Sequence, residues 1–249
     1  GSTASIGPNG KVASYDSGTH DASRVLGDFY ADFPVITDPG ELSGGGSYGT
    51  ISATTTINGS ASKDAPTQYD VAEISLTGNS KSIIINGHVR LIMGGDISIG
   101  GNSNQFVVNS GGSLTIYTEN DISITGNGIV NSDGVAEDFF IYGTAATTVN
   151  GSGDEVAGQS ISIRGNGQLA ATVYAPSAEI EMTGGGASGS VFGGMVGFTA
   201  SVTGGSAFHF DEALRDITFG GGSYTIESWL EMTGQTADTT PVDFSVYSF

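Results

Sequence analysis

The chain lacks cysteine and has few basic residues, and both shortages limit what it can do. Without any Cys among its 249 residues, it can have no disulfide framework, thiolate metal site or cysteine nucleophile. Only 7 Lys and Arg stand against 26 Asp and Glu, which gives a formal net charge of −19. Such a surface repels phosphate backbones and anionic membranes, so we expect no nucleic-acid partner. The charge is compatible with divalent cations or basic partners.

Long apolar runs are also missing. The aliphatic run Ile83–Ile85 is far shorter than the roughly 20 residues that a membrane-spanning helix needs, so we expect no membrane span. No signal peptide is evident. Because the opening Gly1-Ser2 resembles a cloning remnant, we expect the natural protein to continue upstream and to carry its export segment there.

Glycine, in contrast, is abundant, and many of the 41 glycines mark the corners of a repeated phrase. The phrase has an apolar residue, a small or polar one, a second apolar one, a free position, and then Gly-Asn or Gly-Gly. Residues two apart point to the same side of a strand, and glycine tolerates the positive φ of a tight corner. The six copies begin at Ile74, Ile97, Ile122, Ile161, Ile180 and Ala200.

The spacing of these copies predicts a stacked fold. Consecutive copies start 23, 25, 39, 19 and 20 residues apart, and secondary phrases of the same kind lie between them. Each repeat therefore holds about three short strands and three corners, which describes one rung of a parallel β-helix. A leucine-rich repeat would need a helical side, and a propeller blade would be about twice as long. We predict an all-β protein, a right-handed parallel β-helix of about six to seven rungs.

The register of the copies predicts which side chains face the core. The second residue of each phrase should form a polar outer column, and its apolar neighbours should form the inner one. The predicted inner column is Ile74/Leu76, Ile97/Ile99, Ile122/Ile124, Ile161/Ile163, Ile180/Met182 and Val202. The predicted outer column is Ser75, Ser98, Ser123, Ser162, Glu181 and Ser201. We interpret the 39-residue interval between Ile122 and Ile161 as nearly two rungs, with protruding loops at 131–134 and 150–155.

The β-helix should occupy residues 51–214, within one structural domain. An irregular N-terminal segment, 1–50, precedes it, and a C-terminal capping segment, 215–249, comes after it. Helical apolar spacing between Asp21 and Phe33 indicates a possible short helix before the solenoid. A short helical cap at Phe208–Leu214 and a strand over 224–232 should cover the other end.

Five longer phrases carry a resemblance to a known family: Gly94–Asn102, Ser113–Tyr117, Gly126–Asn131, Val173–Glu179 and Phe208–Leu214. They resemble bacterial β-helix domains that accompany PilX-like pilus assembly proteins and other type IV pilus-related surface proteins, a group of largely unknown function. The resemblance covers roughly residues 70–232. It implies an exported or surface protein, and it supplies no established catalytic residues. Members of that family carry an N-terminal hydrophobic segment, which these residues do not include.

Two pairs of residues on the strands are candidate binding positions. His88 and Arg90 are two apart and share a strand face, where they could bind an anionic sugar or simply face solvent as polar surface residues. Asp96 and Asp121 precede Ile-Ser-Ile strands at the same rung position, so they should stack as neighbours. Two such carboxylates either cap turns or share a calcium ion.

One His/carboxylate cluster lies near the end of the repeats. His209, Asp211 and Glu212 could bind a ligand or metal ion, although a metal site needs three or four well-placed ligands. The same residues could instead belong to the terminal cap. No nucleophile signature of the Gly-x-Ser-x-Gly type and no dinucleotide or phosphate loop is evident.

These patterns favour a structural or adhesive function over catalysis. We expect a non-catalytic module of a pilus-related or envelope-associated bacterial protein, located at the cell surface or outside the cell. Its partners would be surface or pilus components, or glycans. The alternative is a carbohydrate-binding or polysaccharide-degrading β-helix, which would need clustered carboxylates or an Arg/Lys-lined groove on one wall.

Overall fold

The computed structural model describes residues 36, 45–165, 169–184, 191–203, 208–211 and 214. All of them belong to one compact unit, Phe33–Gly221. The predicted helix at 21–33, the predicted strand at 224–232 and Glu212 lie outside the described residues.

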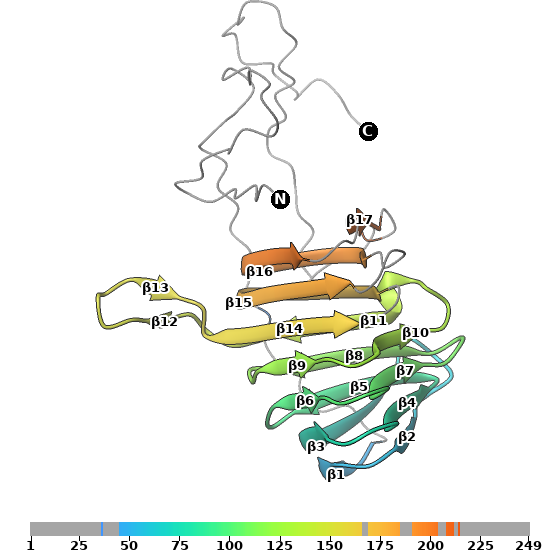
Figure 1. Ribbon diagram of the computed structural model, residues 1–249. Coiled ribbons are helices and arrows are strands. Elements are labelled where there is room, and N and C mark those ends of the chain that lie inside the picture. The colour runs from blue at the N-terminus through green and yellow to red at the C-terminus, as the bar shows by residue number, and fades with distance from the viewer. Residues whose placement is uncertain are drawn as a thin grey trace, which may run out of the picture. The chain divides into compact units, whose positions relative to one another are not determined.

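The described chain is a β-solenoid of about six turns, which confirms the predicted parallel β-helix (Figure 1). The strands form three walls, which we call A, B and C, and the strands within each wall run parallel to one another. The N-terminal turns contribute described strands to all three walls, whereas the last described turns contribute them to walls A and B only. Wall A holds β3 (Thr67–Leu76), β5 (His88–Met93), β8 (Ser113–Thr118), β11 (Phe139–Gly143), β15 (Leu169–Gly184), β16 (Val191–Thr203) and β17 (Phe208–Phe210). Wall B holds the second halves of β3, β15 and β16 together with β6 (Ile97–Ile99), β9 (Ile122–Ile124) and β14 (Gln159–Gly165). Wall C holds β2 (Thr55–Asn58), β4 (Ser82–Asn86), β7 (Gln105–Val108) and β10 (Gly128–Asn131).

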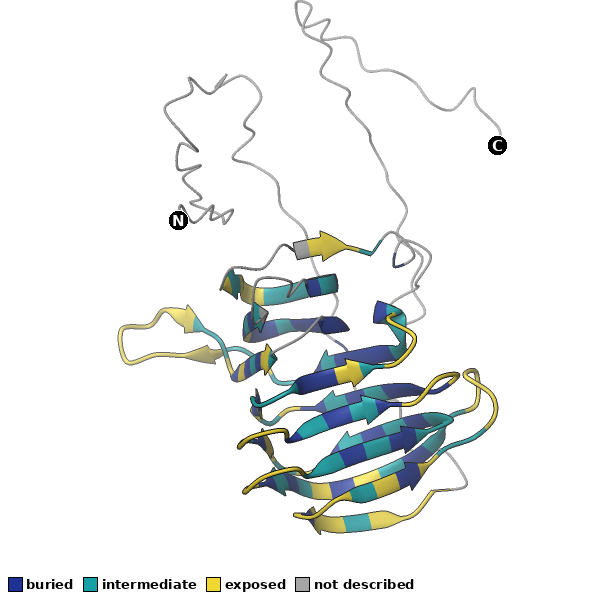
Figure 2. Ribbon diagram, turned by 45° about the vertical axis from the view of Figure 1, so that its right-hand side comes forward, coloured by how far each residue is buried: buried dark blue, intermediate teal, exposed yellow. Residues whose placement is uncertain are grey.

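The inner column of wall B is the one that the repeat predicts. Ile97 pairs with Ile74 and Ile122, and Ile161 pairs with Ile122 and Ile180. The isoleucines, Leu76 and Met182 of this column are at most 1% exposed. The serines between them point outward, as the alternation of buried and exposed residues along the strands shows (Figure 2). At the last described strand of wall B the column is less covered, and Val202 is only partly buried.

The corners between walls B and C depend on close backbone approach. Gly101 has φ +100°, and a Cβ placed on it would lie 1.9 Å from the carbonyl oxygen of Gly78. Only glycine fits such a position. Asn104, which is completely buried, fills the inside of this corner: its Nδ2 donates to the carbonyl oxygens of Leu76 and Gly78, each at 3.2 Å. Its Oδ1 accepts the Lys81 N–H at 2.8 Å, so one amide joins neighbouring turns.

The prediction of nearly two rungs between Ile122 and Ile161 is wrong. These residues are direct register partners, so the interval is a single turn with an insertion. The extra residues form an antiparallel hairpin of β12 (Thr148–Val149) and β13 (Glu155–Val156), which projects from the walls (Figure 1). The β-branched run Thr147 to Val149 is typical of a strand, but Val149 is 71% exposed and contributes nothing to the core.

Both ends of the solenoid differ in detail from expectation. The first strand, β1 (Ser47–Ile51), pairs with β3 and begins before the predicted start at residue 51. At the other end, Phe208–Phe210 is strand β17 on wall A, not part of a helical cap. Beyond this strand, the Leu214 N–H donates to the Asp211 carbonyl oxygen at 3.1 Å. The open edge of β16 offers backbone partners to residues 208–210, and these outweigh their local helical preference.

Candidate functional site

The outer face of wall A carries the predicted pair His88 and Arg90. Both side chains lie on the outer side of β5, because the intervening Val89 is completely buried. The predicted sharing of one strand face is therefore confirmed. The neighbouring turns add a hydroxyl group, carboxylates and stacked aromatic rings to this face.

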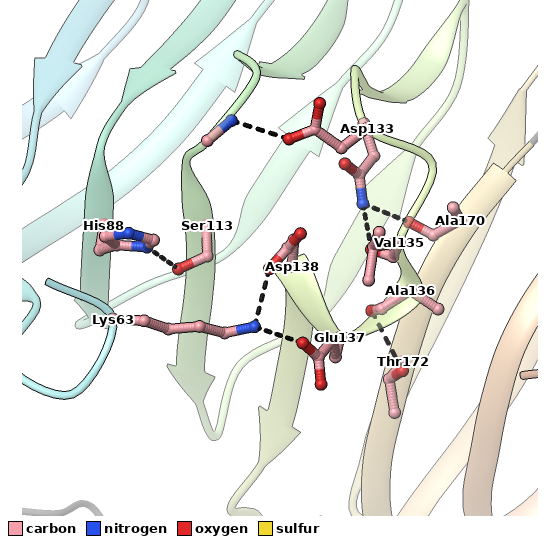
Figure 3. Close-up of polar contacts among 12 residues, drawn as sticks. Lys63, His88, Ser113, Asp133, Val135, Ala136, Glu137, Asp138, Ala170 and Thr172 are labelled. Carbon is pink, nitrogen blue, oxygen red and sulfur yellow. Dashed lines mark hydrogen bonds and ion pairs between the residues drawn. The ribbon is translucent and has the colours of Figure 1, made fainter. Parts of the chain in front are cut away.

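His88 contacts a serine one turn along the stack. His88 Nδ1 and Ser113 Oγ lie 2.9 Å apart, since the two residues are register partners on β5 and β8 (Figure 3). Histidine beside a serine hydroxyl is the start of a nucleophilic site. Here, however, Ser113 is only 5% exposed, so the hydroxyl is shielded from a substrate. No local motif reveals Ser113, because 25 residues separate it from His88 and only the register joins them.

An ion-pair cluster lies beside this contact at the corner of walls C and A. Lys63 Nζ lies 2.8 Å from Glu137 Oε1 and 2.7 Å from Asp138 Oδ1 (Figure 3). The carboxylates belong to the single helical turn η2 (Ala136–Asp138), more than seventy residues further along the chain. We call this arrangement the Lys63 clasp.

The clasp sets one positive charge against two negative ones. Burial acts to lower the pKa of Lys63, but the hydrogen bonds to Asp138 and Glu137 outweigh it and raise that pKa above its usual value. The ammonium is thus held in its charged form as a tie between turns, and it is a poor proton acceptor. Sequence reasoning missed this cluster, because nothing in the spacing of Lys63, Glu137 and Asp138 shows that a loop brings them together.

Arg90 lies at the foot of an aromatic column. Its guanidinium carbon is 5.6 Å from the centroid of the Tyr117 ring, and Tyr117 stacks on Tyr142 with centroids 4.8 Å apart. Burial, followed by the neighbouring Tyr117, raises the pKa of Tyr142 well above its usual range, although Arg90 acts to lower it. Among the described residues, Arg90 Nε is buried without a hydrogen-bond partner.

On strands β11 and β15, the outer face of wall A is covered by another segment of the chain. Phe140 and Tyr174 point outward yet are 5% and 1% exposed, and Ile36 packs against them. Residue 36 precedes the first strand of the solenoid, so part of the N-terminal segment lies on wall A. The accessible part of wall A is therefore the region nearer its N-terminal strands, around His88 and Arg90 on β5.

Asp96 and Asp121 are neighbours along the stack, but each carboxylate is directed to a backbone group of the next turn. Asp96 Oδ1 accepts the Asp121 N–H at 3.1 Å, and Asp121 Oδ1 accepts the Ser160 N–H at 2.8 Å. Both are thus turn caps of the kind that the sequence allowed. Within the part of the chain that the structure describes, no three His, Cys, Asp or Glu side chains form a group that could hold a metal ion. Calcium binding by this pair stays a prediction.

The third predicted cluster is described only in part. His209 is exposed on β17, where its ring stacks on Phe192 with centroids 4.8 Å apart. The Asp211 N–H donates to the Gly193 carbonyl oxygen at 3.2 Å, which places this residue against the edge of β16. Glu212 lies outside the described residues, so the joint role of the three residues stays a prediction.

A pocket of about 270 Å³ lies beside these residues at the C-terminal end of wall A. It is lined mainly by apolar side chains, and the only polar side chains of its lining are Thr172 and Tyr174. The Thr172 hydroxyl donates to the Ala136 carbonyl oxygen at 3.2 Å and is thereby engaged. The lining residues are Thr172, Val173, Tyr174, Gly194, Met195, Val196, Ala200, Phe210 and Leu214.

The stacked parallel turns and the three walls define the class of the protein, a parallel β-helix. Residues 47–217 match the family model described as Domain of unknown function (DUF7305), and the chain belongs to that family. The matched range runs from the first residue of β1 to just beyond the last described turn. No curated protein and no solved structure matches the chain. Among the described residues, no helix has the length and apolar character needed to cross a membrane.

Proposed function

We propose that the protein is a non-catalytic structural or adhesive module that is exported and displayed at a bacterial surface. One observation carries the proposal: polar side chains on the outside of the solenoid are bonded from turn to turn. On wall C, Asn86 Nδ2 donates to Asn58 Oδ1 at 3.1 Å, and Asn109 Nδ2 donates to Asn86 Oδ1 at 2.6 Å. Such a ladder stiffens the stack, because each amide holds the next turn in register.

The charged groups have the same arrangement. The carboxylates of Asp96 and Asp121 cap the turns above them, and Arg164 pairs with Glu181 at 2.9 Å. Catalytic acids and bases instead need to be within reach of a substrate proton. Groups that are already committed to neighbouring turns support a mechanical role for the solenoid better than a reaction.

Surface display and pilus association have a narrower basis. They rest on the resemblance of phrases such as Val173–Glu179 and Phe208–Leu214 to pilus-related β-helix domains. The high negative charge and the absence of cysteine are compatible with an exported protein. Proteinase treatment of intact bacteria that express the natural protein tests this part: a surface protein is degraded, whereas an internal one survives.

Carbohydrate binding on wall A is the second candidate function. Arg90 favours it, because a guanidinium group is a good donor to sugar hydroxyls and uronate carboxylates, and the Arg90 side chain is partly exposed on wall A. The Tyr117 and Tyr142 rings stack on each other, so these two ring faces are not available to a sugar ring. Recognition there would depend on hydrogen bonds more than on ring stacking.

The decisive experiment offers the protein a panel of neutral and acidic polysaccharides. Release of reducing ends or unsaturated uronates measures catalysis, and retention on immobilised glycans measures binding. We expect no turnover, and any binding should fall about tenfold in a His88→Ala/Arg90→Ala variant, as for the loss of about 1.4 kcal/mol of contacts. A Ser98→Ala/Ser123→Ala variant on wall B is the matched control. Turnover that disappears only in the wall A variant would refute the non-catalytic proposal.

A further inference from the structure

The hairpin β12–β13 is a feature that the solenoid does not require, and its tip holds an Asn-Gly pair with unusual contacts. Asn150 Oδ1 accepts two backbone N–H groups, from Ser152 and from Asp154, each at 2.9 Å. Asn150 Nδ2 lies 3.3 Å from Asp154 Oδ2. The whole tip, residues 150–154, is exposed to solvent.

Gly151 completes the arrangement. Its N–H makes no hydrogen bond to any described residue, and a Cβ placed on it would have nothing within 4 Å. An unengaged amide nitrogen next to an asparagine side chain is a potential intramolecular nucleophile, and glycine leaves it sterically open. The two N–H groups on Oδ1 would stabilise the negative charge that develops on that oxygen during attack.

We propose that Asn150 is a self-modification site, at which the side-chain amide is lost through a cyclic imide. The Gly151 nitrogen loses its proton to solvent and bonds to Asn150 Cγ. The Cγ–Nδ2 bond then breaks, and Nδ2 leaves as ammonia after taking a proton from water. Water next adds to either carbonyl of the imide and opens the ring to aspartate or isoaspartate. No oxidant, metal or second protein is needed.

Two Asn-Gly pairs on wall C are held differently. At Asn58-Gly59, the Gly59 N–H donates to the Asn86 carbonyl oxygen at 2.7 Å, and the Asn58 side chain belongs to the amide ladder of this wall. At Asn86-Gly87, the side chain is bonded on both sides within that ladder. Both side chains are bonded to residues of neighbouring turns, so they can move into the geometry of attack only if the stack opens. The contacts of Asn150 instead lie within the exposed tip, 150–154, which can rearrange without disturbing the stack.

A further pair, Asn127-Gly128, lies at the start of β10 and is engaged on both of its groups. Asn127 Nδ2 donates to Gln105 Oε1 at 3.2 Å, and the Gly128 N–H donates to the Thr125 carbonyl oxygen at 3.4 Å. The nitrogen that would attack is therefore already a donor, unlike that of Gly151. Within the described chain, the reaction should thus be selective for the hairpin.

The modification would change the hairpin and leave the solenoid intact. It adds a negative charge next to Asp154 and Glu155, where like charges repel. The isoaspartate product also inserts an extra backbone atom, which breaks the pairing of the Asn150 N–H with the Asp154 carbonyl oxygen, 2.9 Å in the unmodified chain. The exposed β12–β13 hairpin would thus accumulate aspartate and isoaspartate at position 150, while the solenoid stays folded.

Incubation of the folded protein at mildly alkaline pH, followed by peptide mass spectrometry, tests the proposal. Conversion at Asn150 should be at least about tenfold faster than at Asn86, a modest effect for a favourable orientation. A Gly151→Ala variant should slow it, and an Asn150→Asp variant should elute in ion exchange with the modified product. In concentrated urea the Asn150 and Asn86 rates should converge, because the fold no longer distinguishes them.

Two results would overturn the inference. One is an intact Asn150 in the folded protein after the urea-treated chain has reacted there. The other is conversion of Asn86-Gly87 in the folded protein at the rate of Asn150-Gly151. Enzymatic methylation of isoaspartate gives an independent measurement, and circular dichroism verifies that the solenoid stays folded during the incubation.

Discussion

Walls A and B have the same strand repeat but very different outer faces. The outer face of wall B is a column of small serines interrupted only by Glu181 among its described positions, whereas that of wall A carries His88, Arg90 and stacked tyrosines. Inside, both walls are apolar and almost completely buried. The inner positions are therefore constrained by packing alone, and the outer positions are where one wall can become distinctive without affecting the fold.

The two walls also differ in where their contacts come from. On wall B, contacts join residues of adjacent turns at equivalent places, such as Asp96 and Asp121. At the edge of wall A, Lys63 reaches η2 from a loop more than seventy residues away, and Ile36 covers Phe140 and Tyr174. Wall B is a local product of the repeat, while wall A also depends on segments outside the repeat.

The largest expected effect concerns the corner that ends wall B. Gly101→Ala would place a methyl group 1.9 Å from the Gly78 carbonyl oxygen in a backbone with φ +100°. We expect a loss of about 3 kcal/mol or more of unfolding free energy, from strain and clash together. Gly78→Ala is the matched control, because Gly78 has φ +87° but nothing within 4 Å of an added Cβ, and it should cost only about 1 kcal/mol. Urea denaturation measures both, and equal losses would contradict the close approach.

The inner and outer columns of wall B can be compared on one strand. Ile124 is completely buried and Ser123, its neighbour on β9, is exposed. Ile124→Ala should reduce the unfolding free energy by about 3 kcal/mol, because it leaves a cavity in a close-packed core. Ser123→Ala should change it by less than about 0.5 kcal/mol. Urea denaturation of both variants tests whether Ile124 faces the core and Ser123 faces solvent. A larger loss of unfolding free energy in Ser123→Ala than in Ile124→Ala would contradict these orientations.

The contribution of wall A to the unfolding free energy, unlike that of wall B, should decrease at alkaline pH. Folding raises the pKa of Tyr142, so its neutral form stabilises the fold below the unfolded value of about 10 and this contribution is lost as pH rises further. The loss is up to about 1.4 kcal/mol per pH unit above that value. Tyr142→Phe removes the titrating group, so its Tm should fall less steeply than that of the unmodified chain above pH 10. Thermal unfolding across that range measures the difference, and superimposable curves would show that Tyr142 is not the group responsible.

The smallest expected effect separates a turn cap from a metal ligand on wall B. Asp121→Ala removes the acceptor for the Ser160 N–H and should cost about 1 kcal/mol. Asp121→Asn keeps an oxygen acceptor and should be nearly neutral. Calcium titration followed by thermal unfolding extends the test: a calcium-dependent rise in Tm that Asp121→Asn abolishes would favour the metal site over the cap.

The repeat alone determined much of this protein. Apolar residues two apart and corners of Gly-Asn identified the parallel β-helix, and the inner column from Ile74 to Met182 could be assigned from the copies alone. This was possible because adjacent turns repeat the same pattern, so each residue's neighbours are equivalent residues of the chain. His88 and Arg90 were placed on one face by the same two-residue period.

Only the tertiary structure decided the rest. The interval before Ile161 could have been one turn or two, and pairing with Ile122 settled it, because an exposed hairpin and a buried strand can share one apolar pattern. The contacts of His88 with Ser113 and of Lys63 with Glu137 and Asp138 likewise depend on register and loop path. A period in the sequence specifies what lies above and below each residue, but it carries no information about loops that leave the period and return to it several turns away.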